Sequence, residues 1–458
     1  MFHTDTIAAI STGMTSSGIG IVRISGPDAV EIADKIYDSR NGKKLADMPT
    51  HTIHYGYIRD GEEFLDEVLV MLMRGPRSFT AEDTVEINCH GGVYAMNRIL
   101  ELVTRKGARL AEPGEFTKRA FLNGRIDLSQ AEAVIDVINA KNEYALKSSV
   151  SQLKGSVLKA VREIREKIIY HIAYIESALD DPEHISLDGY PEQLEEQTEQ
   201  WIEKITSLIA SAENGKRMKE GIRTVIVGKP NAGKSSLLNV LLGEERAIVT
   251  DIAGTTRDVL EEQMSLSGIS LNIIDTAGIR ETEDVVEKIG VKKAKTYAKD
   301  ADLVIYVVDS STQLDENDEE IMELIRDRKA IVLLNKMDLD PVTTEEMIRE
   351  RLDKPVIPIS AKEEQGIDRL EQTVKDMFYD GNLSFNDQIY ITNMRQKAAL
   401  SEALESLKQV MTSIQNQMPE DFFSIDLMNA YEELGSITGE SVGEDLVNEI
   451  FSKFCMGK

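Results

Sequence analysis

Apolar and polar residues alternate over the first part of the chain in a pattern typical of β-strands. The alternation predicts strands over residues 19–26, 68–73 and 84–89. Apolar residues spaced by three and four positions then predict a helix over residues 94–106. Strands combined with a helix in this way indicate a small α+β domain, which we place at residues 1–118.

From Ser129 onward the period changes to that of an amphipathic helix. Ser129 and Glu132 have the spacing of a helix capping box. One continuous apolar stripe follows, made of Val150, Leu153, Val157, Val161, Ile164, Ile168, Ile172, Ile175 and Leu179. The stripe predicts a single long helix that ends at Asp181 and Pro182. A second stripe lies between Leu194 and Ala212, and each stripe needs partner helices to cover it.

Strand and helix patterns alternate between residues 221 and 379, which predicts an α/β domain with a parallel sheet and crossover helices. Helical periodicity returns over residues 380–458, with a second capping-box pattern at Ser441 and Glu444. Two interpretations are open. In the more economical one, residues 119–220 and 380–458 form one all-α domain into which the α/β domain is inserted. In the other, the two flanks form separate bundles.

The charge of the chain narrows the class of partner. The 458 residues include 52 Lys and Arg against 80 Asp and Glu, so the formal net charge is −28. This acidity argues against a protein that coats nucleic acid or membrane through bulk charge. Two cysteines, Cys89 and Cys455, cannot build a disulfide framework, and no apolar run reaches the roughly 18 residues of a membrane span. We therefore expect a cytoplasmic protein with no membrane partner.

A phosphate-binding motif opens the α/β domain. An apolar segment leads into G-x-x-x-x-G-K-S at residues 228–235, and a helix-like segment follows. The backbone N–H groups of such a loop and the helix N-terminus attract phosphate oxygens. Lys234 adds a positive charge for the β- and γ-phosphates, and Ser235 offers a hydroxyl ligand for Mg²⁺. This placement between strand and helix favours a nucleotide site over a chance match.

Three further motifs follow in the order that a guanine-nucleotide-binding domain requires. Residues 254–258 offer a threonine hydroxyl to Mg²⁺, and residues 275–278 end a strand with a carboxylate and a glycine N–H. The motif N-K-x-D ends another strand at Asp338, whose carboxylate can accept two hydrogen bonds that guanine donates and adenine cannot. Residues 359–362 then bring a backbone N–H close to the guanine oxygen. The predicted nucleotide is GTP.

Two positions depart from the pattern of many regulatory GTPases. No glutamine follows residues 275–278, so another residue must orient the hydrolytic water. Four acidic residues are candidates: Glu281, Glu283, Asp284 and Glu287. Asn231 lies within the phosphate loop, either as an ordinary turn residue or as an oxygen ligand for a monovalent cation. Such a cation would occupy the place where another class of GTPase uses an arginine finger.

Asn231, the loop at 250–258, the segment PGEFTKRAFLNGR at 113–125 and the C-terminal CMGK at 455–458 together resemble the MnmE (TrmE) family of tRNA modification GTPases. This family lies within the TrmE-Era-EngA-YihA-Septin-like superfamily. The resemblance covers the whole chain and the order of its three domains. It implies a homodimer whose N-terminal domain binds folate and mediates dimerisation.

The resemblance also implies a reaction and a partner. With the flavoprotein MnmG, in a heterotetramer or larger assembly, such a protein adds an aminomethyl or carboxymethylaminomethyl group to carbon 5 of the wobble uridine of certain tRNAs. 5-Formyl- or methylene-tetrahydrofolate supplies the one-carbon unit, FAD and NADH enter through the partner, and hydrolysis of GTP drives the conformational cycle. Because the chain is acidic, we expect the partner or the N-terminal portion to supply much of the contact with tRNA phosphates.

Carried over by position, the resemblance implies the following site residues. The K⁺ ligands are Asn231, Thr250, Ile252 and Thr255, and the Mg²⁺ ligands are Ser235 and Thr256. Glu287 orients the hydrolytic water, and Lys234 acts in catalysis. The nucleotide contacts are Asn231, Ala232, Gly233, Lys234, Ser235, Ser236, Thr250, Asp251, Ile252, Ala253, Gly254, Thr255, Thr256, Asp275, Thr276, Ala277, Gly278, Asn335, Lys336, Asp338, Ser360, Ala361 and Lys362.

The implied folate site has an ordinary alternative at each position. Its residues are Arg23, Glu86, Arg125 and Lys458, which suit the pterin edge and the glutamate tail of folate. Arg23 and Glu86 could equally be a structural ion pair, and Lys458 an unordered chain end. The family's functional thiol corresponds to Cys455, although a lone cysteine near a chain end is more often inert.

Two other functions compete with tRNA modification. One is an RNA-binding GTPase switch in ribosome assembly, but such proteins rely on a basic appendage and residues 380–458 are acidic. The other makes the N-terminal domain a freestanding folate-dependent one-carbon transferase that the GTPase regulates.

Overall fold

The computed structural model describes residues 5–241, 243, 262–266, 268–274, 301–379, 389–455 and 457. The chain divides into two compact units, each treated by itself below. The first unit comprises Met1–Ile135, Gln152–Leu194 and Gln409–Lys458. The second comprises Asp136–Ser151 and Glu195–Lys408. Each unit is therefore assembled from segments that are far apart in the sequence.

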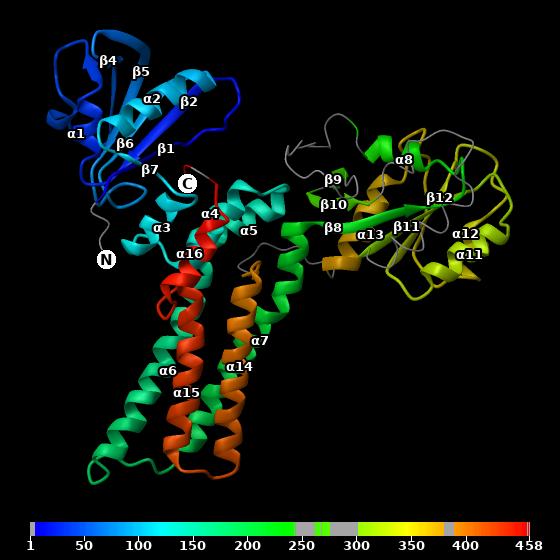
Figure 1. Ribbon diagram of the computed structural model, residues 1–458. Helices are drawn as coiled ribbons and strands as arrows, with labels where there is room; N and C mark the ends of the chain where they lie inside the picture. Colours follow the sequence, from blue (N-terminus) through cyan, green and yellow to red (C-terminus); the bar gives the residue numbers. More distant parts are fainter. Residues whose placement is uncertain are drawn as a thin grey trace. The chain divides into compact units, whose positions relative to one another are not determined.

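Within residues 5–110, all of which are described, seven strands form one sheet (Figure 1). The order is β3-β4-β5-β6-β2-β1-β7, and every pair is antiparallel except β1 with β7. The elements of this region are β1 (Ile7–Ile10), β2 (Ser17–Ser25), α1 (Ala29–Asp34), β3 (Tyr37–Ser39), the 3₁₀ turn Leu45–Asp47, β4 (Thr52–Asp60), β5 (Glu63–Met73), β6 (Thr84–Gly91), α2 (Val93–Arg105) and β7 (Arg109–Leu110).

The predicted alternation corresponds to the two faces of this sheet. In β5, Val68, Val70 and Leu72 are buried beneath the helices, whereas Leu69 between them is exposed. Helices α1 and α2 cover the buried face, where Ile99 and Leu102 of α2 join the same core. The strands predicted at 19–26, 68–73 and 84–89 and the helix at 94–106 are confirmed, with boundaries that differ by a few residues.

Helices make up most of residues 115–220 and 394–452. They are α3 (Glu115–Leu122), α4 (Leu128–Ile138), α5 (Glu143–Leu153), α6 (Ser156–Asp180), α7 (Tyr190–Glu220), α14 (Met394–Gln415), α15 (Glu420–Thr438) and α16 (Glu444–Ser452). In the first unit, α6 and α15 pack side by side (Figure 1). The Arg165 guanidinium of α6 lies 4.0 Å from the ring centroid of Tyr431 on α15. Helix α6 precedes the α/β region in the sequence and α15 follows it. A single helical domain formed by both flanks requires such a contact.

Three local predictions about these helices are wrong. The stripe from Val150 to Leu179 is not one helix, because Gly155 adopts a left-handed φ of 86° and separates α5 from α6. The cap of α4 is Asp127, whose Oδ1 accepts the Ser129 and Gln130 N–H groups at 2.7 and 3.2 Å. Helix α16 begins after Gly443, so the predicted cap at Ser441 lies outside it.

The part of the second unit that is described contains a six-stranded sheet in the order β13-β12-β11-β8-β10-β9. All pairs are parallel except β9 with β10, as the predicted strand–helix alternation requires. The strands are β8 (Ile222–Val227), β9 (Glu262–Leu266), β10 (Ile269–Ile273), β11 (Leu303–Asp309), β12 (Ala330–Asn335) and β13 (Val356–Pro358). The helices of this region are α8 (Lys234–Leu241), α11 (Glu316–Ile325), α12 (Glu345–Arg349) and α13 (Ile367–Tyr379).

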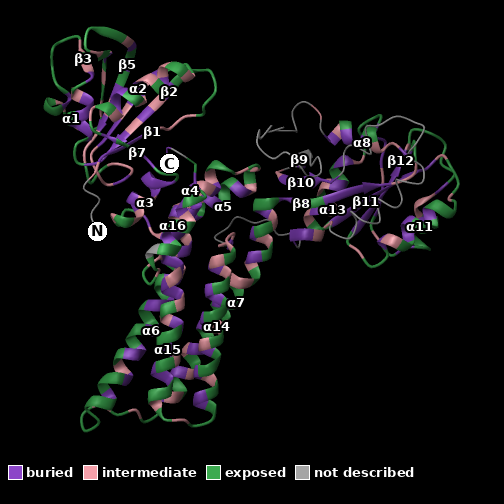
Figure 2. Cartoon of the chain, in the orientation of Figure 1, coloured by how far each residue is buried: buried purple, intermediate pink, exposed green. Residues whose placement is uncertain are grey.

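Both faces of this second sheet are covered. In β11, Ile305 and Val307 join one apolar core, while Val304 and Tyr306 join the other. Figure 2 shows β11 and β12 buried along their length. Two-sided burial explains the unbroken apolar runs of these strands. Since the strands are parallel, the loops that follow β8, β11 and β12 lie at one edge of the sheet, where such folds bind ligands.

Candidate functional site

The phosphate loop connects β8 to α8. Asn231 has a left-handed φ of 60° and Gly233 a φ of 97°, both of which a tight loop of this kind demands. A Cβ added at Gly233 would overlap the side-chain amide of Asn335, so only glycine fits this position. Ser235 and Ser236 lie exposed in the first turn of α8, where the backbone N–H groups point outward. The loop can therefore wrap around an anion.

Lys234 is held by the loop itself. Its Nζ donates to the carbonyl oxygens of Gly228 at 2.9 Å and Lys229 at 2.7 Å. Burial lowers the pKa of this ammonium from its ordinary value, because a charged group is disfavoured away from water. Phosphate oxygens would compensate that cost.

Asn335, at the end of β12, connects the phosphate loop to the loop after β13. Its Nδ2 donates to the carbonyl of Ala232 at 2.9 Å, and its Oδ1 accepts the Ala361 N–H at 3.0 Å. The side chain is only 2% exposed. Asn335 thus joins Ala232, which lies 103 positions earlier in the chain, to Ala361, which lies 26 positions later. The Ala361 N–H would have to be shared with Asn335 if it also contacted a base.

The next two predicted base contacts lie beside Asn335. The Asp338 carboxylate accepts the Ser360 hydroxyl at 2.8 Å, and this hydrogen bond lowers the pKa of Asp338 from its ordinary value. Lys362 Nζ lies 4.0 Å from the same carboxylate. The Asp338 carboxyl group is therefore favoured in its ionised form, in which both oxygens can accept hydrogen bonds.

Asp309, at the end of β11, is a residue that sequence reasoning missed. Its Oδ2 lies 2.6 Å from Lys336 Nζ. Burial alone would raise the pKa of Asp309, but hydrogen bonds from Lys336 and Ser311 outweigh it and the pKa lies below its ordinary value. Lys336 itself has a left-handed φ of 66°. The ion pair fixes the direction of the Lys336 side chain. The one feature of the sequence that could have indicated Asp309 is its place as an aspartate at the end of a strand.

Part of the predicted site lies outside the described residues. This holds for Thr250, Asp251, Ile252, Ala253, Gly254, Thr255, Thr256, Asp275, Thr276, Ala277, Gly278, Glu281, Glu283, Asp284, Glu287 and Lys458. Of the four predicted K⁺ ligands only Asn231 is described, and of the two predicted Mg²⁺ ligands only Ser235.

A second cluster lies in the first unit, on the face of the N-terminal sheet away from α1 and α2. Arg23 of β2 and Glu86 of β6 form an ion pair of 2.7 Å whose side chains are each 13% exposed. The Arg23 guanidinium also donates to the carbonyl of Gly457 at 3.4 Å, and Ser11 Oγ donates to the same oxygen at 3.0 Å. The end of the chain is thereby brought to the predicted folate residues.

Aromatic rings complete this cluster. The guanidinium carbons of Arg23 and Arg125 lie 5.6 and 5.0 Å from the ring centroid of Phe79. Arg23 also lies 5.5 Å from the ring centroid of Phe116. Cation–π contacts of this kind orient both guanidinium groups toward one region. Phe79, Phe116 and Gly457 were not predicted, because no local pattern links them to Arg23.

The two cysteines lie in different environments. Cys89 is buried, and burial raises the pKa of its thiol to about 11. Cys455 is exposed, and its carbonyl accepts the Gly114 N–H at 3.3 Å. Cys455 is therefore the accessible thiol, and it precedes the residue that contacts Arg23 by two positions.

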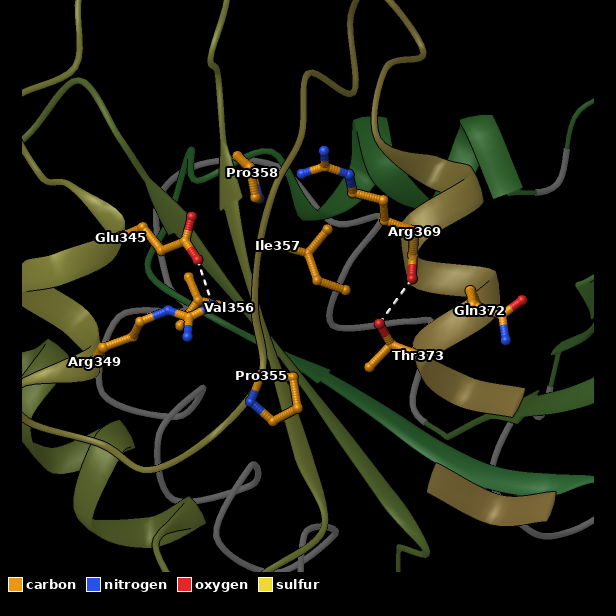
Figure 3. A pocket seen from close by; sticks show the side chains of 9 residues that line it. All are labelled: Glu345, Arg349, Pro355, Val356, Ile357, Pro358, Arg369, Gln372 and Thr373. Atoms are coloured by element: carbon orange, nitrogen blue, oxygen red, sulfur yellow. Dashed lines mark hydrogen bonds and ion pairs between the residues drawn. The ribbon is translucent and has the colours of Figure 1, made fainter. Parts of the chain in front are cut away.

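A cavity of about 350 Å³ also lies in the second unit, along β13. Figure 3 shows Arg349 on one side of the strand and Arg369 on the other, with Val356 and Ile357 between them. Glu345 pairs with Arg349, and Thr373 bonds to the Arg369 carbonyl. None of the predicted site residues lines this cavity. It is separate from both clusters described above.

Over the described residues, no helix is long and apolar enough to cross a bilayer.

Two protein-family models match the chain. One, described as the GTP-binding protein TrmE N-terminus, matches residues 6–125, and the other, described as the MnmE helical domain, matches residues 128–455. The helical-domain match begins before the α/β region and ends after it. A single helical domain formed by both flanks requires a match of this extent.

Two curated relatives are similar over their whole length. The chain is 63% identical over 456 residues to the tRNA modification GTPase MnmE of Lachnoclostridium phytofermentans, covering 99% of this chain and 100% of that one. It is 50% identical over 459 residues to the tRNA modification GTPase MnmE of Clostridioides difficile, covering 100% of both. Among solved structures, a variant of Aquifex aeolicus Era is 29% identical over 40% of this chain and 66% of that chain, with a TM-score of 0.27 that supports no further comparison. The chain belongs to the MnmE family of tRNA modification GTPases.

Proposed function

We propose that this chain hydrolyses GTP with the help of Mg²⁺ and K⁺ and, together with the flavoprotein MnmG, modifies carbon 5 of the wobble uridine of certain tRNAs with a one-carbon unit from tetrahydrofolate. Membership of the family supports the general activity. The names of both full-length relatives favour tRNA modification over a switch in ribosome assembly. The remaining parts of the proposal are supported by the two clusters of residues.

The observation that carries the proposal is the junction at Asn335. One amide joins Ala232 of the phosphate loop to Ala361, and Asp338 lies beside it with a carboxylate ordered by Ser360. A carboxylate placed next to a phosphate loop can accept from both the N1–H and the amine of guanine. The arrangement supports selection of GTP over ATP.

The phosphate loop supports the proposed metal chemistry. Ser235, exposed at the start of α8, fits a hydroxyl ligand for Mg²⁺, which neutralises phosphate charge when bound. Asn231 is exposed, and its side-chain oxygen is of the type that K⁺ prefers. We propose that Thr250, Ile252 and Thr255 complete the K⁺ site, that Thr256 completes the Mg²⁺ site, and that Glu287 orients the hydrolytic water.

The cluster around Arg23 supports folate binding. Glu86 can accept from the amino-pyrimidine edge of a pterin, and the cations Arg23 and Arg125 suit the carboxylates of the glutamate tail. Their approach to Phe79 and to the chain end fits a ligand with both an aromatic ring and negative charges. We propose that Lys458 adds a further cation and that Cys455 is the functional thiol.

The open face of the N-terminal sheet supports the proposed homodimer. Ile53 and Tyr55 on β4 and Leu69 on β5 are 59%, 38% and 47% exposed. Tyr55 and Leu69 are register partners, so these side chains lie together on one face. An apolar face of this kind suits a protein interface.

Asp338→Asn tests the guanine assignment. Xanthine carries an oxygen where guanine carries its amine, so an asparagine amide can donate to it. We expect kcat/KM for GTP to fall by about 10²-fold and that for xanthosine triphosphate to rise. Asp340→Asn, two residues away and exposed, is the matched control and keeps the preference for GTP. An unchanged preference in Asp338→Asn would refute the assignment.

Potassium and tRNA chemistry have separate tests. Turnover of GTP in K⁺ and in Na⁺ at equal ionic strength should favour K⁺, and equal rates would exclude the potassium mechanism. Mass analysis of wobble uridines in tRNA from cells that lack the gene should show loss of the carbon-5 substituent. Intact substituents, together with co-purification with ribosomal particles, would favour the ribosome-assembly function instead.

A further inference from the structure

An ion-pair cluster ties the phosphate loop to a neighbouring helix of the second unit. Lys229 Nζ lies 2.7 Å from Asp318 Oδ2 and 3.0 Å from Asp315 Oδ2. The Lys229 side chain is 16% exposed and Asp318 only 1%. None of these three residues belongs to the nucleotide-binding set that the sequence predicts.

The acidic side of the cluster is rigid. Asp315 caps α11 by accepting the Asn317 and Asp318 N–H groups, and Asp318 completes the capping box by accepting the Asp315 N–H at 2.9 Å. The other oxygen of Asp318 accepts the hydroxyl of Tyr306, a fully buried residue of β11, at 2.7 Å. Lys229 therefore binds a fixed point made by one strand and one helix.

The backbone of Lys229 acts directly on Lys234. The Lys229 carbonyl accepts Lys234 Nζ at 2.7 Å and the Ala232 N–H at 3.3 Å, and the Gly228 carbonyl accepts Lys234 Nζ at 2.9 Å. An ammonium group has three N–H donors. Two of them are taken up by these carbonyls, which leaves the third donor for a phosphate oxygen.

We propose that Lys229 is a positioning residue for the nucleotide: its ion pairs with Asp315 and Asp318 fix the carbonyl that aims the Lys234 ammonium at the phosphates. The inference rests on the proposed role of Lys234 in binding GTP. It adds a connection through which the position of α11 sets the affinity of the loop for phosphate.

A purely structural role for this cluster makes a different prediction. If the ion pairs only stabilise the fold, their loss lowers the melting temperature and leaves the affinity of the folded protein for nucleotide unchanged. If Lys229 positions Lys234, the affinity falls even where the protein is fully folded. Dissociation constants measured well below the melting temperature separate these outcomes.

The test compares variants of the full-length protein. Lys229→Met removes the ammonium and keeps the length of the side chain, and Lys229→Arg retains both ion pairs. Arg326→Met is the matched control, because it removes an exposed ion pair with Glu323 from the other end of α11. Binding of GDP and of the non-hydrolysable analogue GppNHp is measured by equilibrium titration, and GTP turnover gives KM and kcat.

We expect Lys229→Met to weaken binding of both nucleotides and to raise KM by about tenfold, because a misdirected ammonium loses contact with phosphate. Lys229→Arg restores binding to within about threefold of the wild type, and Arg326→Met leaves it unchanged. Asp315→Asn, at a half-exposed position, weakens binding in the same direction without burying an unpaired charge. Equal affinity in wild type and Lys229→Met overturns the inference, as does a loss that Lys229→Arg fails to restore.

The proposed function and this inference fail in different ways. If the wild type does not bind GDP or GppNHp, the nucleotide site itself is wrong. If the wild type binds both and Lys229→Met binds them equally well, only the positioning role is wrong.

Discussion

The phosphate loop and the cluster around Arg23 are assembled from the sequence in opposite ways. Lys234 finds both of its carbonyl partners, Gly228 and Lys229, within the same short loop. Arg23 instead contacts Gly457, which lies 434 positions away along the chain. A site made by one loop is visible as a motif, whereas a site made by chain ends is visible only after folding.

The two regions also use charge differently. Lys234 is a partly buried cation held by neutral carbonyls, so its charge is available to an incoming anion. Arg23 is already paired with Glu86 at 2.7 Å, so a ligand must share or exchange that contact. We therefore expect single substitutions to have larger effects in the phosphate loop than in the Arg23 cluster.

Lys234→Met tests the phosphate loop, and its effect should exceed those of the other substitutions. The variant keeps an apolar stem of similar length and removes the ammonium that the Gly228 and Lys229 carbonyls hold. Loss of a directed charge at the reacting phosphates should lower kcat/KM for GTP by about 10³-fold. Steady-state hydrolysis measures the change, and binding of 5-formyl-tetrahydrofolate, whose proposed site lies in the other unit, should stay unchanged. A loss of less than tenfold would show that Lys234 does not carry the phosphate contact.

The same contrast explains what could be predicted from the sequence. The phosphate loop and the N-K-x-D motif were predicted because their function depends on adjacent residues. Asn335 as a connection between two loops, Asp309 beneath Lys336 and the ion pairs of Lys229 were missed, because each depends on how parallel strands align their ends. Arg23, Glu86 and Arg125 were assigned only through family resemblance.

The errors in secondary structure have the same cause. The apolar stripe continues across Gly155 although the helix does not, because the stripe reports which face is buried and not whether the backbone is continuous. At α4 the capping-box pattern of Ser129 competes with Asp127 two residues earlier, and the aspartate accepts both N–H groups. Periodicity thus predicted the faces of the helices, while single residues decided their ends.

Glu86→Gln tests the Arg23 cluster and should have the next largest effect. If Glu86 accepts hydrogen bonds from folate, loss of its charge should weaken binding of 5-formyl-tetrahydrofolate by about 10²-fold. If Glu86 only pairs with Arg23, the melting temperature falls and folate affinity does not. Calorimetric titration and thermal unfolding distinguish the two results. Glu63→Gln removes an exposed pair with Arg98 from the same sheet and is the matched control.

Gly457→Ala gives the smallest effect and asks whether the end of the chain belongs to the folate cluster at all. Gly457 has a left-handed φ of 87°, and a Cβ there would overlap the Ile10 carbonyl and lie 2.9 Å from Ser11 Cα. The alanine should displace the chain end from Arg23 and Ser11, at a local cost of about 1–3 kcal/mol. We expect folate affinity to fall by about tenfold while GTP turnover in the isolated protein is unchanged.

Gly42→Ala separates backbone strain from displacement, because Gly42 has a similar φ of 64° with open space around it. It should lower stability slightly and leave folate binding intact. If Gly457→Ala also binds folate normally, the chain end is only a neighbour of the cluster and the site reduces to Arg23, Glu86 and Arg125 on residues 23–125. The folate site would then come from one continuous segment of the chain. It would differ from the phosphate loop in the wider spacing of its residues and no longer in joining the two ends of the chain.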